Sequence, residues 1–164
     1  MKTISQLIIT MMICLFSIQA WAQSGKLFNT DNQLSSNLAT QVFQDKSGFI
    51  WIATRNGLNN YDGYHITVIK KDMSNFLGLN SNYIISIAQD EKEHILLGTN
   101  NSLLEFTGSE FLKIPMLDSK GKELATYVKQ IYPLRNKDVA VATSGYGIML
   151  KKQGAQECHA MKGE

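Results

Sequence analysis

Carboxylates are the side chains of this sequence whose spacing could support acid–base chemistry. Five of them fall in two short segments, at Asp45, Asp62, Asp90, Glu91 and Glu93. General acid–base catalysis needs two such groups held within reach of one substrate. The residues around all five are typical of turns, where a carboxylate accepts hydrogen bonds from backbone N–H groups. We therefore expect turn caps here and no catalytic pair.

The other residues that could do chemistry are isolated. Cys158 and His159 are adjacent, but no further Cys or His stands at the spacing of a zinc site, so we expect an exposed tail. We interpret His65 and His94 as solvated strand residues without a carboxylate partner at recognisable spacing. The glycines in Gly145-Tyr146-Gly147 precede no helix that could hold a phosphate. No catalytic residue, metal ligand or cofactor is predicted.

Length and composition restrict the class of protein. The 164 residues are 44% hydrophobic and 18% charged, which is typical of a globular chain with roughly one domain. The formal net charge is +2, and no basic cluster occurs. Because nucleic-acid binders concentrate Lys and Arg on one surface, we predict no nucleic-acid partner.

The first 22 residues are predicted to be a secretory signal peptide. Lys2 precedes an apolar stretch from Leu7 to Ile18, and Ala20-Trp21-Ala22 supplies the small residues for cleavage after Ala22. The alternative is a membrane anchor, but the stretch is shorter than the roughly 20 residues that cross a bilayer. Cleavage predicts a periplasmic protein that retains only Cys158 and forms no intrachain disulfide.

The chain repeats itself after 45 residues. When residues 34–66 are placed on residues 79–111, ten positions are identical. A third and weaker copy puts Val139, Val141 and Thr143 where Ile95, Leu97 and Thr99 stand. The identical pairs are Leu34/Leu79, Ser36/Ser81, Asn37/Asn82, Gln44/Gln89, Asp45/Asp90, Ile50/Ile95, Thr54/Thr99, Asn56/Asn101, Leu58/Leu103 and Gly63/Gly108.

Each unit is expected to contain four short strands joined by three turns. Asp45 and Gly48 predict a type I turn, in which Asp caps the first position and Gly tolerates the last. Asn56-Gly57 predicts a primed hairpin turn, because both residues tolerate positive φ. Asp62-Gly63 marks the third turn. The expected strands are Leu38 to Gln44, Phe49 to Thr54, Leu58 to Tyr61 and His65 to Lys70.

Four antiparallel strands per repeat of about 45 residues predict an all-β fold of β-propeller blades. The second strand of each unit is apolar on both faces, so we expect Trp51 to pack between blades, with a sugar-stacking platform as the alternative. Thr54 and Thr99 are expected to satisfy local backbone groups. Closed propellers have about four to eight blades. About three blades therefore predict an incomplete open arc, whose end faces need the remaining blades or a partner protein.

Ligand contacts are expected in the segments between blades. Ligands of propellers usually meet loops at one end of the central channel, so we expect contacts from Lys71 to Leu79 and from Asp118 to Leu124. No single ligand-binding residue is assigned.

The predicted boundaries follow from the repeat. The units are a signal peptide (1–22), a lead-in strand (23–33), blades at 34–78 and 79–123, a partial blade at 124–154 and a tail at 155–164.

The run NLATQVFQDKSGFIWIATRNGLNNYDG resembles the two-component regulator propeller repeat. That pattern is an Asp-rich turn, Gly-aromatic-Ile-Trp-Ile-Gly/Ala-Thr, then Gly-Leu and Tyr-Asp-Gly. The second copy departs from it at Glu93, Leu96 and Thr107. The residues that match the motif are Asp45, Gly48, Trp51, Thr54, Asn56, Gly57, Leu58, Tyr61, Asp62 and Gly63, followed by Asp90, Thr99 and Gly108.

The resemblance covers roughly residues 34 to 154 and carries expectations about function. It implies the periplasmic sensor region of a hybrid two-component histidine kinase that detects oligosaccharides. This sequence contains no kinase core, so we predict a sensor portion without catalysis of its own and an oligosaccharide as its partner. The alternative is an exported β-propeller module that binds another protein and no small ligand.

Overall fold

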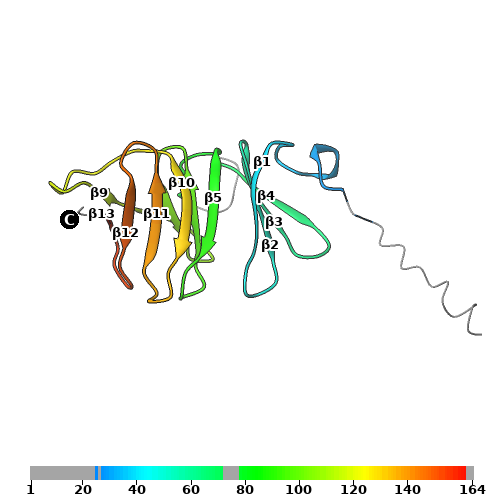
Figure 1. Ribbon diagram of the computed structural model, residues 1–164. Coiled ribbons are helices and arrows are strands. Elements are labelled where there is room, and N and C mark those ends of the chain that lie inside the picture. Colours follow the sequence, from blue (N-terminus) through cyan, green and yellow to red (C-terminus); the bar gives the residue numbers. More distant parts are fainter. Residues whose placement is uncertain (1–24, 26, 72–77, 162–164) are drawn as a thin grey trace, which may run out of the picture.

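The computed structural model describes residues 25, 27–71 and 78–161 of the chain, so the predicted signal peptide and its cleavage site lie outside the described residues. The described residues fold into three β-sheets and one short 3-10 helix, η1 (Thr30–Asn32). Figure 1 shows the sheets following one another in chain order across the molecule. The predicted all-β fold of propeller blades in an open arc is confirmed.

The first two sheets are four-stranded antiparallel meanders, in which each strand pairs with the next one along the chain. Short turns between strands give this order, because antiparallel neighbours can be joined by two to five residues. The first sheet contains β1 (Ala39–Gln44), β2 (Ile50–Thr54), β3 (Gly57–Tyr61) and β4 (Ile66–Ile69). The second contains β5 (Ile84–Gln89), β6 (Ile95–Thr99), β7 (Leu103–Phe106) and β8 (Phe111–Ile114).

The third sheet has five strands and corrects the prediction of a partial blade with an exposed tail. Cys158 is fully buried and belongs to a strand of this sheet, which pairs in parallel with a strand just after β8. The apolar Cys158 side chain and the register with Met116 hold this segment against the sheet. The strands are β10 (Val128–Pro133), β11 (Val139–Thr143), β12 (Ile148–Lys151), β13 (Cys158–Ala160) and β9 (Met116–Leu117).

The first strand of every sheet carries the same irregularity. The register between the first two strands shifts between Ala39 and Gln41, between Ile84 and Ser86, and between Val128 and Gln130. A β-bulge bends a strand and increases its twist. The three blades therefore share one backbone plan, including the third, in which few residues of the repeat are retained.

Two hydrophobic cores lie between the three blades. Trp51, Ala53 and Leu58 of the first blade pack with Ile84 and Phe106 of the second in one cluster. In the other cluster, buried side chains on the far face of the second blade pack against Val128, Val141 and Met149 of the third. Because the second blade is covered on both faces, all five residues of β6 are buried.

Two local predictions are wrong. The hairpin between β2 and β3 has Arg55 and Asn56 in its loop, and only Gly57 has a positive φ, of 134°, so this is not a primed turn centred on Asn56-Gly57. The backbone N–H of Gly57 donates to Asn82 of the next blade, which stabilises this arrangement. The described part of the predicted lead-in strand contains η1 and no strand. No helix in the described part of the chain is long and apolar enough to span a membrane.

Candidate functional site

The repeat motif builds a rigid turn between the first two strands of the first blade. One carboxylate oxygen of Asp45 accepts the backbone N–H of Phe49 at 2.9 Å, and the other accepts Nε1 of Trp51 at 2.7 Å. Gly48 has a φ of 91° and donates its N–H to the Asp45 carbonyl. The Trp51 ring is buried and meets Phe106 of the next blade edge to face at 5.8 Å. Trp51 therefore packs between blades as expected, and only 6% of the residue is exposed.

Thr54 closes the other end of the same strand. Its hydroxyl donates to the Gly57 carbonyl at 2.8 Å and accepts the backbone N–H of Asn56 at 3.0 Å. In the second blade, Thr99 makes the same kind of bond to the Ser102 carbonyl at 3.1 Å. Both threonines satisfy local backbone groups.

The remaining motif residues of the first blade are also structural. Leu58 is fully buried in the core between blades. The Tyr61 hydroxyl donates to the carbonyl of Gly63, whose φ is 101°. Asp62 accepts the backbone N–H groups of His65 at 2.7 Å and Tyr64 at 2.8 Å, and these bonds lower the pKa of its carboxyl. In the second blade, Gly108 takes the turn position of Gly63, with a φ of 99°.

The carboxylates of the second blade divide into two kinds. Asp90 caps its turn as expected, because its Oδ1 accepts the backbone N–H groups of Lys92 and His94. Glu93 instead forms an ion pair with the side chain of Lys46 in the first blade. Glu91 likewise makes no turn cap, so capping is the wrong interpretation for both glutamates.

Glu91 binds across to the third blade. Its Oε2 lies 2.8 Å from Nε2 of Gln153 and 3.2 Å from Nζ of Lys137. Desolvation opposes ionisation of Glu91, but these two partners leave its pKa lowered. The turn after β5 is therefore connected to the third blade by an ion pair and a hydrogen bond of Glu91.

A row of aromatic and basic side chains lies where the first strands of the blades begin. Tyr83 directly precedes β5 and Tyr127 directly precedes β10, and their rings meet edge to face at 6.3 Å. The guanidinium of Arg55, from the first blade, lies 5.4 Å from the Tyr83 ring centre. Nζ of Lys129 lies 5.1 Å from the Tyr127 ring centre. We call these four residues the aromatic row.

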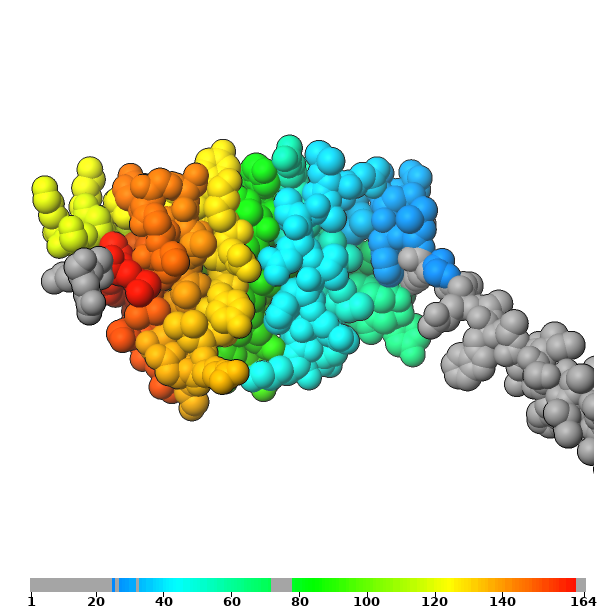
Figure 2. Space-filling view, in the orientation of Figure 1, coloured from blue at the N-terminus to red at the C-terminus, as the bar shows by residue number. Residues whose placement is uncertain are grey.

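The aromatic row spans all three blades because its positions repeat. Tyr83 and Tyr127 occupy the place before the first strand where the first blade has Leu38, which is 58% exposed. Tyr127 is 43% exposed and Tyr83 is half-buried. Figure 2 shows the three blades side by side on the face that it presents. Such a row offers ring faces and hydroxyl, amino and guanidinium donors to a ligand that crosses from blade to blade.

The sequence predictions missed the aromatic row. They placed ligand contacts in the segments between blades, from Lys71 to Leu79 and from Asp118 to Leu124, and no finding tests these contacts. The signal for the row was present in the 45-residue shift, which puts Leu38 on Tyr83. Two tyrosines at equivalent positions become a pair only because the first strands of adjacent blades lie side by side.

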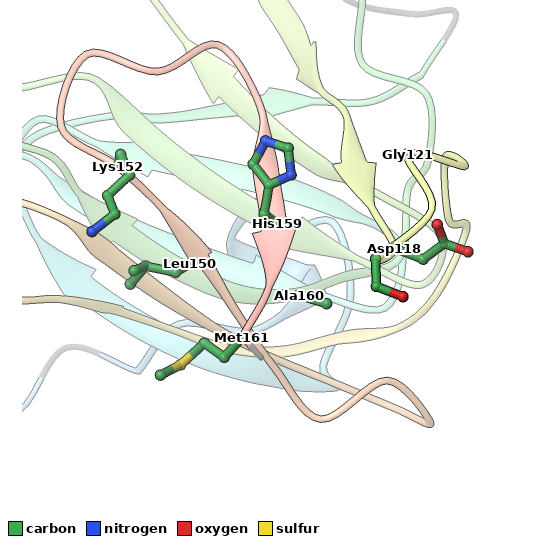
Figure 3. Close-up of a pocket in the computed structure, with 8 residues that line it drawn as sticks. Asp118, Gly121, Leu150, Lys152, His159, Ala160 and Met161 are labelled. Carbon is green, nitrogen blue, oxygen red and sulfur yellow. The ribbon is translucent and has the colours of Figure 1, made fainter. Parts of the chain in front are cut away.

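A concavity lies at the outer edge of the third blade, far along the sheet from β10 (Figure 3). Its volume of about 590 Å³ falls in the range of ligand pockets. Part of the segment from Asp118 to Leu124 contributes to it. We call it the edge hollow, and it is lined by Asp118, Ser119, Gly121, Leu150, Lys152, His159, Ala160 and Met161.

The charged side chains of the edge hollow already have protein partners. Asp118 caps its own turn, and the backbone N–H groups of that turn lower the pKa of its carboxyl. Lys152 lies 3.5 Å from the Asp138 carboxylate, and His159 lies 2.8 Å from Glu157. The edge hollow is confined to the third blade and the segment before it, whereas the aromatic row spans all three blades, so we take the aromatic row as the candidate site.

The prediction for His94 is wrong, because this side chain has two carboxylate partners. Its Nδ1 lies 3.0 Å from Glu105 and 3.9 Å from Asp90. His65 is exposed as expected, but its Nδ1 lies 3.8 Å from Asp62, so the expectation that it has no carboxylate partner is wrong as well. The sequence spacing gave no warning of Glu105, because that residue comes from β7 and faces His94 only through strand pairing.

Two segments of the chain, residues 33–56 and 78–101, match the family model for the two component regulator propeller. These segments contain the turns at Asp45 and Asp90, Trp51 and both capping threonines. The resemblance found from the repeat motif is thus confirmed for the first two blades. No curated protein matches the sequence.

Solved structures with a similar fold include two extracellular domains from one bacterium. The extracellular domain of BT4673 from B. thetaiotaomicron, described as a hybrid two component system, has a TM-score of 0.62 and 20% identity over 73% of this chain and 17% of its own. The corresponding domain of BT3049 from the same organism has a TM-score of 0.62 and 18% identity, over 79% and 17% of the two chains.

A third similar structure is PorZ of Porphyromonas gingivalis, described as a surface component of the type-IX secretion system. It has a TM-score of 0.56 and 14% identity over 76% of this chain and 21% of its own. The chain therefore spans about a fifth or less of the structures that it resembles.

Proposed function

We propose that this chain, which carries two-component regulator propeller repeats, is the ligand-sensing part of a two-component regulatory system and has no catalysis of its own. We infer an oligosaccharide as its ligand and export to the periplasm as its route. The proposal is carried by one observation, the aromatic row at the beginning of the first strands. The extracellular domains with the same fold support it.

The chemistry of the row suits a saccharide. A pyranose ring presents C–H groups on its faces and hydroxyls on its edge, so it needs a ring platform beside hydrogen-bond donors. Tyr83 and Tyr127 supply rings that each carry a hydroxyl, and Arg55 and Lys129 supply cationic donors above the rings. Because the four side chains come from three blades, a ligand of several sugar units can contact more than one blade.

Calorimetric titration of the full chain with a panel of neutral and acidic oligosaccharides tests this proposal. Tyr83→Ala and Tyr127→Ala should each weaken binding by about tenfold, the value of one aromatic platform. Tyr64→Ala is the matched control, because Tyr64 is 82% exposed in a turn of the first blade and lies outside the row. No binding to any saccharide, or equal loss with Tyr64→Ala, would refute the proposal.

A second function is favoured by the uncovered face of the third blade. Tyr132 and Ile148 are 62% and 54% exposed there, beside Ala140 and Ala142 in one shallow concavity. The face of the second blade that points in the same direction is buried against the third. Apolar faces of this kind in repeat proteins are covered by caps or partners. We infer that a blade-like protein surface covers this face.

Sedimentation velocity distinguishes this second function from sensing alone. If the face binds a blade of a second copy of this chain, the chain should self-associate as its concentration rises, and Ile148→Asp should shift the equilibrium towards monomer. Val68→Asp is the control, because Val68 is a partly exposed apolar residue of the first blade. A monomer at every concentration would count against the interaction module and leave the saccharide proposal intact.

A further inference from the structure

Three potential metal ligands converge at the edge of the second blade. Nδ1 of His94 lies 3.0 Å from Oε1 of Glu105 and 3.9 Å from Oδ2 of Asp90, and the three ligand atoms all lie within 4.8 Å of one another. The side chain of Asp90 is 7% exposed, that of Glu105 is 11% exposed and that of His94 is 31% exposed. The cluster is thus largely buried and opens to solvent at the imidazole.

The first blade shows how the same framework looks without these ligands. There the equivalent positions are Asp45, Phe49 and Asn60. Both oxygens of Asp45 are occupied, one by a backbone N–H and the other by Nε1 of Trp51.

Three differences in the second blade change this turn. Leu96 replaces the tryptophan, so Oδ2 of Asp90 loses that donor and faces His94 instead. His94 and Glu105 replace the phenylalanine and the asparagine. A turn cap thereby becomes a cluster of two carboxylates and one imidazole.

The charges of the cluster are not balanced. Among the described residues, His94 is the only basic side chain that pairs with Asp90 or Glu105. A protonated imidazole would offset one of the two negative charges. Buried carboxylates are costly unless they are paired or bind a metal. A divalent cation on all three side chains would neutralise both carboxylates while the imidazole stays neutral.

We propose that Asp90, His94 and Glu105 bind one Zn²⁺ ion. Zinc ligand atoms lie about 2.0–2.2 Å from the ion, which in a tetrahedral site puts them roughly 3.4 Å apart. The two distances from His94, 3.0 and 3.9 Å, bracket that separation, and no two of the three ligand atoms are more than 4.8 Å apart, so the side chains would have to draw together to bind the ion. One nitrogen and two carboxylates suit Zn²⁺, whereas Ca²⁺ and Mg²⁺ prefer oxygen ligands alone.

The zinc site would have three protein ligands and an outer position open to solvent at His94. On binding, Nδ1 of His94 gives up any proton that it carries and coordinates the ion through its lone pair. Glu105 lies on the face of β7 that points towards the third blade, and the turn that holds Asp90 also carries Glu91, which binds Gln153 and Lys137. The ion would therefore fix the turn that links the second blade to the third.

Titration of the metal-free full chain with ZnCl₂ in a non-chelating buffer tests the site. Calorimetry should give one equivalent of Zn²⁺, and EDTA should reverse a rise in Tm. His94→Phe and Glu105→Asn install the residues of the first blade. Each should lower the affinity for Zn²⁺ by more than about 100-fold, because loss of a residue that only supports a metal ligand costs at most about 100-fold. Glu105→Gln keeps the size and a hydrogen bond to His94, so it should fold normally and still lose zinc.

His65→Phe is the matched control, because His65 also lies in a turn beside a carboxylate but has an exposed side chain. It should leave the affinity unchanged. Co²⁺ loading should give visible absorption bands in the chain and in His65→Phe, and not in His94→Phe. The proposal is overturned if no stoichiometric Zn²⁺ binds, or if Glu105→Gln with native circular dichroism binds it as tightly as the unaltered chain.

Discussion

Adding one methyl group at Gly98 should weaken the packing of the second blade against the third. Gly98 lies in β6 on the face that packs against the third blade, and its φ is not in the left-handed region, so the backbone itself would accept alanine. A Cβ at this position would overlap Oγ of Ser86 and lie 2.5 Å from Cγ1 and 2.8 Å from Cβ of Val128. The neighbouring blade leaves no room for it.

The cost follows from this overlap. Overpacking of a filled core costs about 1–3 kcal/mol, which for a domain of this size corresponds to a fall in Tm of roughly 3–10 °C. Urea unfolding followed by far-UV circular dichroism measures the change. Val128→Ala removes Cγ1, so the double variant should be more stable than the sum of the two single effects predicts, by about 1 kcal/mol.

The chain supplies a control for the Gly98 experiment. Ala142 occupies the equivalent position in the third blade, on a face against which none of the described strands of another blade packs. Ala142→Val should change the free energy of unfolding by less than about 0.5 kcal/mol, as is usual for surface changes. If Gly98→Ala is equally harmless, or shows no coupling to Val128, the described packing between these blades is wrong.

Three further outcomes are expected. Trp51→Phe keeps a ring but leaves Asp45 without its Nε1 donor, so urea unfolding should show a loss of about 1–2 kcal/mol. The hydrogen bond from the backbone N–H of Gln153 lowers the pKa of Asp138 in the folded chain. The Asp138 carboxylate therefore stabilises the folded state above its unfolded pKa of about 4, and this stabilisation is lost as the pH falls through the lower folded pKa. Acid titration of Asp138→Asn should lack that loss. Burial raises the pKa of Cys158 to about 12, so a thiol reagent at pH 8 should label it only after unfolding.

Local chemistry made much of the fold predictable. Asp45 and Gly48 specify their turn within four residues, and the apolar runs around Trp51 and Leu96 identify the strands that are buried on both faces. The repeat then placed the second blade by comparison with the first. These features depend on contacts close in sequence, where residue type limits the backbone strongly.

Features that depend on contacts between distant segments could not be predicted in this way. Cys158 is buried because β13 pairs with β9, in which Met116 lies 42 residues earlier in the chain. The residues next to Cys158 in the sequence do not indicate this pairing. Tyr83 meets Tyr127 because two blades stand side by side. Glu105 faces His94 through the pairing of adjacent strands. Each is a consequence of blade packing, which a repeat predicts only in outline.

The parallel pairing of β13 with β9 has a consequence for how the chain folds. Strands β10 to β12 need only short turns to pair, whereas β13 must return to a segment about 40 residues earlier, and closing such a loop carries a larger entropic cost. Non-local pairings of this kind form late and slowly. During synthesis, the edge of β9 that pairs with β13 would stay open until Cys158 to Ala160 have left the ribosome, although β9 pairs locally with Glu123 on its other side. The third blade should therefore gain its protection from hydrogen exchange last, in a step that the first two blades do not share.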